Sequence, residues 1–81
     1  MTPDEIRAAF LAALTEVAPE IDPATLTSAE HLQEDLELDS MDVLNLVAAL
    51  DTKLGVAIPE ADYPRIATPD AAVAYLGERL G

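Results

Sequence analysis

A serine beside an aspartate, directly before a long apolar run, is the feature of this sequence that most clearly suggests chemistry. Asp39 and Ser40 stand where an acid-rich segment gives way to the apolar run 43–50. A serine at the start of a helix is exposed, and the backbone N–H groups around it point outward, where they can face an anion. This geometry suits a hydroxyl that carries a phosphodiester, although the same pattern also describes an ordinary N-capping serine.

Three other kinds of site can be set aside. His31 is the only histidine, and a Ser-His-Asp hydrolase would also need a nucleophile elbow and an oxyanion loop, which the sequence lacks. The acids from Asp35 onward do not match a calcium loop, because its sixth position is Ser40 instead of glycine and its twelfth is Leu46 instead of glutamate. There is no cysteine for a disulfide or a thiolate metal site. We therefore predict no catalytic residue and no metal site.

The elements that must position Ser40 are helical, beginning with one at the N-terminal end. Thr2, Pro3 and Glu5 make a capping-box start with a proline at the first helical position. Apolar residues then recur at helical spacing until Pro19 ends the helix near residue 17 or 18. A long connection over residues 19–39 follows, and its apolar residues are spaced to anchor it on the core: Ile21, Leu26, Leu32, Leu36 and Leu38.

Three more helical segments are predicted after this connection. The second helix begins at Asp39 or Ser40 and ends near Leu54, with Gly55 in the left-handed conformation behind it. Residues 59–63 make one or two turns, which Pro64 stops. Residues 68–70 open the last helix, whose predicted buried stripe is Ala72, Val73, Leu76 and Leu80. We expect an all-α fold, a small four-helix bundle forming one domain over residues 1–81, with a long first loop and a short third helix.

The net charge of the chain limits the classes of partner that it can bind. Sixteen acids against four Lys and Arg residues give a formal net charge of −12, which should repel nucleic acid and anionic membranes and attract basic protein patches. No apolar run approaches the roughly 20 residues needed to span a bilayer, and the N-terminus lacks the basic start of a signal peptide. The absence of cysteine fits a reducing compartment. We predict a cytoplasmic monomer.

The sequence Asp39-Ser40-Met41-Asp42 resembles the attachment site of acyl carrier proteins. The resemblance extends over essentially the whole chain, because it also includes the apolar run after this site, Gly55 and the pair Ile58-Pro59. The resemblance implies that Ser40 is esterified with 4′-phosphopantetheine by a separate phosphopantetheinyl transferase, which uses CoA and Mg²⁺. The thiol that ends this arm would hold acyl groups as thioesters, so the chain would be a carrier and not an enzyme. Asp39 either orients the arm or serves only as the N-cap.

The resemblance also implies two sets of binding residues. Acyl-loading and acyl-processing enzymes with basic patches are expected to dock on the acids and exposed apolar residues near the serine: Glu34, Asp35, Glu37, Met41, Asp42, Leu44 and Ala48. An acyl chain can be sheltered between the second and third helices, where the expected lining residues are Leu46, Leu50, Ile58, Tyr63 and Ile66. In the alternative reading, the acids are only a solvated loop and Leu44 belongs to the core.

The sequence departs from the family pattern at three positions. Glu37 stands where glycine is usual, Met41 where leucine is frequent, and Asn45 where an acid is common. The second helix is therefore less acidic than in fatty-acid carriers, which favours a specialised pathway.

Several functions remain open. Fatty-acid, polyketide and other secondary-metabolite synthesis are all compatible, as is peptidyl or aminoacyl carriage. The short ends beyond the outer helices favour a free-standing protein. A hypothesis of a different class is a small acidic interaction module without a prosthetic group, in which Ser40 only caps its helix.

Overall fold

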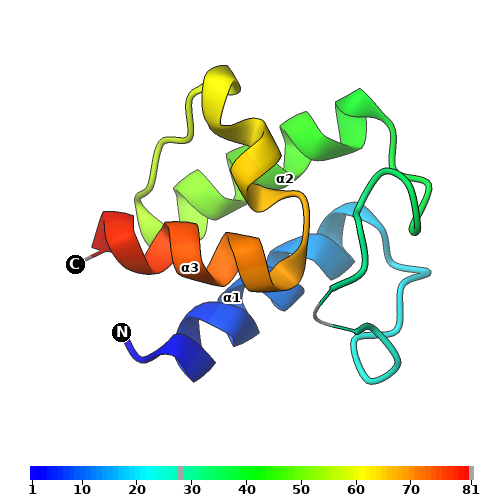
Figure 1. Ribbon diagram of the computed structural model, residues 1–81, viewed down its shortest axis with the longest axis horizontal. Coiled ribbons are helices and arrows are strands. Elements are labelled where there is room, and N and C mark those ends of the chain that lie inside the picture. The colour runs from blue at the N-terminus through cyan, green and yellow to red at the C-terminus, as the bar shows by residue number, and fades with distance from the viewer. Residues whose placement is uncertain (28, 81) are drawn as a thin grey trace.

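The chain folds into helices joined by one long and two short connections (Figure 1). The computed structural model describes residues 1–27 and 29–80. Within those residues it contains three α-helices and one 3₁₀ helix: α1 (Pro3–Val17), α2 (Ser40–Leu54), η1 (Glu60–Ile66) and α3 (Pro69–Leu80). The predicted all-α bundle, with its long first loop and short third helix, is confirmed.

The helix ends lie where the capping residues predict them. Thr2 and Glu5 form a capping box at the start of α1, and the α1 helix ends at Val17, before Pro19. Gly55 closes α2 in the left-handed conformation, with φ 68° and ψ 25°. These boundaries depend on interactions within a few residues, which explains why the sequence alone predicts them.

The core lies between α1 and the helices that pack on it, α2 and α3. Phe10 and Leu14 of α1 are completely buried, as are Leu46 and Leu50 of α2 and Leu76 of α3. Burial of these side chains is the main force that holds so small a domain together. The helix η1 packs against α3.

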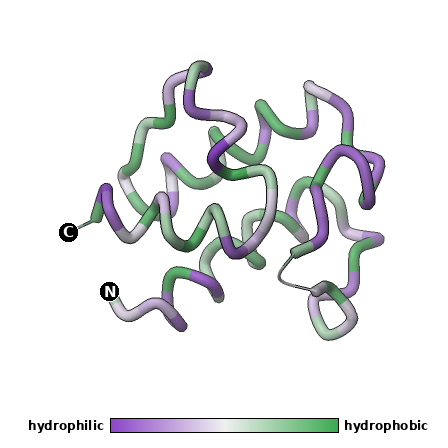
Figure 2. The backbone as a smooth tube through the Cα atoms, viewed as in Figure 1, coloured by the Kyte–Doolittle hydropathy of each residue, from purple (hydrophilic) through white to green (hydrophobic). Residues whose placement is uncertain are grey.

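The long connection between α1 and α2 is anchored by apolar side chains, as predicted. It shows hydrophilic and hydrophobic stretches in turn in Figure 2, and the segment that leads into α2 is mostly hydrophilic. Leu32 and Leu38 are buried, while Ile21, Leu26 and Leu36 are partly buried against the core. The anchors fix the path by which the chain reaches the start of α2.

Two details of the C-terminal half differ from the sequence prediction. The short helix does not stop at Pro64 but continues through it to Ile66. Tyr75, which the predicted stripe of α3 omits, is 1% exposed and belongs to the core. The two elements are linked, because the Tyr75 hydroxyl donates a 2.7 Å hydrogen bond to Oδ2 of Asp62 and so ties η1 to α3.

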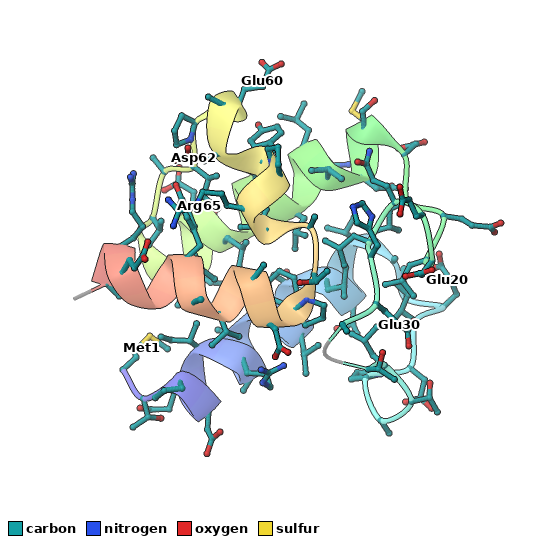
Figure 3. All side chains as sticks on the ribbon, in the orientation of Figure 1. Met1, Glu20, Glu30, Glu60, Asp62 and Arg65 are labelled. Carbon is teal, nitrogen blue, oxygen red and sulfur yellow. The ribbon has the colours of Figure 1, made fainter. Side chains whose placement is uncertain are left out.

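Arginine side chains complete the junction between η1 and α3. The Arg65 guanidinium lies 4.7 Å from the centre of the Tyr75 ring and pairs with Glu78 at 2.6 Å. Arg79 lies 5.6 Å from the same ring centre and donates to the carbonyl of Ala57 at 2.9 Å. Figure 3 shows Asp62 and Arg65 on the same stretch of η1. Cation–π contacts and the partly buried hydrogen bond to Asp62 thus offset the hydrogen bond that Pro64 cannot donate.

Replacing Tyr75 with phenylalanine should lower stability in a pH-dependent way. The hydrogen bond to Asp62 and burial raise the pKa of Tyr75 above its ordinary value of 10.0. A raised folded-state pKa stabilises the fold below the unfolded-state value, and this contribution is lost as pH rises through the folded-state value. We therefore expect Tyr75→Phe to be less stable than the wild type at pH 8, with the difference shrinking above about pH 10. Urea unfolding between pH 8 and 11 measures this.

The control for this prediction is Tyr63→Phe, which removes the other tyrosine hydroxyl. No hydrogen bond of that hydroxyl occurs within the described residues, so its removal should leave the free energy of unfolding nearly unchanged at pH 8. Equal stability of Tyr75→Phe and the wild type at pH 8 would contradict a stabilising bond between η1 and α3.

None of the described helices is both long and apolar enough to cross a membrane.

Candidate functional site

The start of α2 presents Ser40 at the surface. Asp39 is the N-cap, and its Oδ1 accepts a hydrogen bond from the backbone N–H of Asp42 at 2.9 Å. The Asp42 carboxylate accepts one from the N–H of Asp39 at 3.3 Å, which completes a capping box. Ser40 is the first residue of the helix and is exposed. Its hydroxyl makes no hydrogen bond within the described residues, so capping occupies Asp39 and leaves Ser40 available.

The residue three positions before Ser40 has an unusual backbone. Glu37 has φ 60°, which places it in the left-handed region that costs a residue with a Cβ roughly 1–2 kcal/mol. This conformation turns the chain between the partly buried Leu36 and the buried Leu38, just before α2 begins. It also gives the physical reason for a preference for glycine at this position.

Glycine at position 37 should therefore stabilise the fold. Relief of the strain exceeds the extra chain entropy that glycine brings to the unfolded state, and we expect Glu37→Gly to raise the free energy of unfolding by about 0.5–1 kcal/mol. Glu37→Ala is the matched control, because it removes the same negative charge and keeps the strain. Urea unfolding of both variants separates backbone from charge, and equal midpoints would contradict a strained backbone at Glu37.

The acids and apolar residues expected to dock partners share the surface around Ser40. The exposed acids are Glu34, Asp35 and Glu37, and Asp42 is partly buried by its capping role. Met41 is 61% exposed and Leu44 is 49% exposed, and Ala48 one turn further along α2 is exposed as well. Leu44 is thus a surface residue and not part of the core. No Lys or Arg occurs between Arg7 and Lys53, so no basic side chain interrupts the acids within this segment of the sequence.

An open pocket of about 720 Å³ lies beside Ser40. Ser40, Met41, Val43 and Leu44 line it from α2, and the other lining residues come from the long connection and from η1 with the residue after it: His31, Leu32, Gln33, Glu34, Glu60, Tyr63, Pro64, Ile66 and Ala67. Figure 3 shows Glu60 at the outer end of η1, pointing away from the rest of the fold. The pocket therefore joins α2 to η1 at the exposed serine.

The five residues expected to line an acyl pocket divide between two places. Tyr63 and Ile66 line the pocket beside Ser40. Leu46 and Leu50 have no exposed surface and lie in the core, and Ile58 is buried there as well. None of these last three is among the residues that line the pocket. Leu46 and Leu50 belong to the same apolar face of α2 as Val43, which does line the pocket. The path of the neighbouring segments decides which part of that face is covered by the core and which part faces the pocket.

His31 lines the pocket, although no sequence pattern predicts it there. Backbone N–H groups of Gln33 and Glu34 each donate to its Nδ1 at 3.2 Å. A catalytic triad needs this nitrogen to donate to a carboxylate, so the arrangement is not that of a Ser-His-Asp hydrolase. The position of His31 could be anticipated only by recognising a turn in which its ring caps the N–H groups of Gln33 and Glu34. The Asp35 carboxylate accepts from the His31 N–H at 2.7 Å and fixes the same turn.

Comparisons with known proteins identify a matching family and several relatives of this chain. A family model described as "Phosphopantetheine attachment site" matches residues 4–76. The chain is 33% identical over 61 residues to the acyl carrier protein of Thermotoga maritima, a match that covers 75% of each chain. It is 34% identical over 58 residues to the acyl carrier protein of Rubrobacter xylanophilus, which covers 72% of each chain.

A third relative is the mitochondrial acyl carrier protein of Neurospora crassa, which is 36% identical over 55 residues. That match covers 68% of the present chain and 41% of the Neurospora protein, so the chain spans less than half of that relative. The carriers of this family hold 4′-phosphopantetheine covalently. Together, the match over residues 4–76 and the resemblance to carriers from two bacteria show that this chain belongs to the acyl carrier protein family.

Proposed function

We propose that Ser40 is the attachment residue for 4′-phosphopantetheine and that the chain presents acyl groups, held as thioesters on this arm, to partner enzymes. The observation that carries the proposal is that Ser40 is exposed, lines a pocket beside α2 and has a hydroxyl free of hydrogen bonds within the described residues. When bound, the group supplies a terminal thiol that forms thioesters. The chain itself has no cysteine to do so.

The residues at Ser40 fit a phosphodiester at this position. The backbone N–H groups of the first turn of α2 have no acceptor within the helix, and the N–H of Asp42 is bonded to the Asp39 carboxylate instead. The positive end of the helix dipole lies at the same place. During attachment the Ser40 Oγ loses its proton and displaces adenosine 3′,5′-bisphosphate from CoA. A phosphopantetheinyl transferase with Mg²⁺ must supply the catalytic groups, because the chain only positions the hydroxyl. In this role the protein is a carrier and not an enzyme.

The surface around Ser40 suits basic partners. Glu34, Asp35 and Glu37 are exposed acids, and exposed Met41 and Leu44 offer apolar surface next to them. Long-range attraction between the −12 chain and a basic patch would raise encounter rates, and the two apolar side chains would then be buried in the contact. The partners proposed are the transferase and the enzymes that load and process acyl groups.

The pathway is proposed more broadly than the attachment site. Fatty-acid, polyketide or other secondary-metabolite synthesis fits an acidic carrier with a partly apolar pocket beside its serine. Peptidyl or aminoacyl carriage is the alternative within the same chemistry. A cytoplasmic location fits the absence of cysteine, although one relative is named as mitochondrial.

The test is the intact mass of the folded chain before and after incubation with a broad-specificity phosphopantetheinyl transferase, CoA and Mg²⁺. A gain of one phosphopantetheine, located at Ser40 by fragmentation, is the expected result. No gain on an unmodified, folded chain, with a known carrier modified in the same reaction, would favour the alternative of a small acidic interaction module. That module would bind its partner equally well with and without the treatment.

A further inference from the structure

The imidazole of His31 is held in place by the turn that it begins. Its Nδ1 accepts the backbone N–H groups of Gln33 and Glu34 at 3.2 Å. The His31 carbonyl accepts from the N–H of Asp35 at 2.8 Å, and the Asp35 carboxylate accepts from the His31 N–H at 2.7 Å. Because Nδ1 is an acceptor in both of its bonds, the neutral ring carries its proton on Nε2.

One ring nitrogen of His31 has no hydrogen-bond partner within the residues that the structure describes. His31 and Ser40 both line the pocket, and no hydrogen bond to the His31 Nε2 occurs within the described residues. The next residue, Leu32, is 1% exposed and donates its N–H to the carbonyl of Ala67 at 2.8 Å. This bond ties the His31 turn to the segment after η1, so both walls of the pocket are held at a fixed separation there.

The charges around the pocket make His31 distinct. A phosphodiester on Ser40 is an anion, and the ionisable acids nearest to it in the chain are Asp39 and Asp42. The acids that line the pocket are Glu34 and Glu60, and no Lys or Arg lines it. An anion on Ser40 would therefore meet only uncharged donors in this pocket, and the His31 ring is the one that backbone hydrogen bonds hold in place among the described residues.

We propose that His31 is a positioning residue for the prosthetic group: its Nε2–H donates a hydrogen bond to the phosphodiester on Ser40 and holds the base of the arm against the pocket. The proposal rests on the attachment proposed above. A hydrogen bond to a charged acceptor is stronger than a neutral one, and it is strengthened further when the pocket is covered by a partner. His31 thus sets the direction in which the arm leaves the surface, and takes no part in forming the phosphodiester.

The matched variants are His31→Asn and His31→Ala. The asparagine Oδ1 takes the place of Nδ1 and keeps the bonds from the Gln33 and Glu34 N–H groups, but the side chain has no group where Nε2–H lies. Alanine removes both functions. Equal urea midpoints for His31→Asn and the wild type would show that the turn is retained, so that any change at the phosphorus is caused by the lost Nε2–H.

The experiment is ¹⁵N NMR of the histidine ring and ³¹P NMR of the phosphodiester at one pH. Since the chain has a single histidine, its ring signals need no assignment by mutation. Modification of the wild type should shift the Nε2 resonance and leave Nδ1 an acceptor, and His31→Asn should shift the ³¹P resonance of the modified protein. Ser40→Ala carried through the same incubation should show no ring shift.

The outcomes separate this inference from the proposed attachment. A mass gain at Ser40 with an unchanged Nε2 resonance, or with the same ³¹P resonance in His31→Asn as in the wild type, would overturn the role of His31 and leave the attachment intact. No mass gain at Ser40 would overturn both. If His31→Asn does not fold, the ring resonances of the wild type before and after modification decide the question by themselves.

Discussion

Ser40→Ala is expected to abolish the uptake of phosphopantetheine and leave the fold unchanged. Only an oxygen at this position can form the phosphodiester, so the loss should be complete. The hydroxyl makes no hydrogen bond within the described residues, because Asp39 is the cap of α2. The free energy of unfolding should therefore stay within about 0.5 kcal/mol of the wild type. Intact mass after incubation with transferase and CoA, together with urea unfolding, measures both effects.

Thr68→Ala is the control that reverses both effects. The Thr68 hydroxyl accepts the N–H of Ala71 at 3.2 Å at the start of α3, so it is a capping hydroxyl in fact. Its loss should cost about 1 kcal/mol and leave the mass gain intact. Uptake of phosphopantetheine by Ser40→Ala would refute the assignment, and a large loss of stability in that variant would mean that Ser40 supports the helix after all.

Leu46→Ala is expected to produce the largest loss of stability. Leu46 has no exposed surface and lies in the core on the helix that carries Ser40. Removing its buried atoms and leaving a cavity should cost about 2–5 kcal/mol. A domain of this length has a total stability of only about 4–12 kcal/mol, so the variant should be close to unfolding at physiological temperature. The urea midpoint measures the change.

Leu44→Ala is the matched control for this prediction. It makes the same substitution two positions earlier on the same helix, where the side chain is 49% exposed and lines the pocket. Its effect on the free energy of unfolding should be within about 0.5 kcal/mol. If the two variants had equal midpoints, α2 would not present these leucines to the core and to the surface as the structure shows.

The ends of α1 and α2 are predictable from the sequence alone. Thr2, Asp39 and Gly55 act on backbone groups a few residues away, so their effects need no knowledge of the rest of the fold. The apolar periodicity of α1 and α2 identified the buried faces, because side chains three and four positions apart lie on one side of a helix. The exposure of Ser40 was predictable because the residue stands at the start of a helix, before its apolar face begins.

The predicted end of η1 was wrong because residues distant in the chain stabilise this helix. Pro64 predicts a helix stop, yet η1 continues through it to Ile66 because the Tyr75 hydroxyl bonds Asp62 and the Arg65 guanidinium pairs with Glu78. These partners are 13 residues apart in the chain. A pattern within a short window contains no information on such pairs.

The set of residues that share the pocket with Ser40 depends on contacts between segments that are distant in the chain. The wide apolar face of α2 contains Val43, Leu46 and Leu50, but Val43 lines the pocket and the two leucines lie in the core. His31 joined the site because the bond from the Leu32 N–H to the carbonyl of Ala67 brings the long connection against the end of η1. Helical periodicity specifies a face, whereas the neighbour that covers each part of the face depends on contacts between segments far apart in the chain.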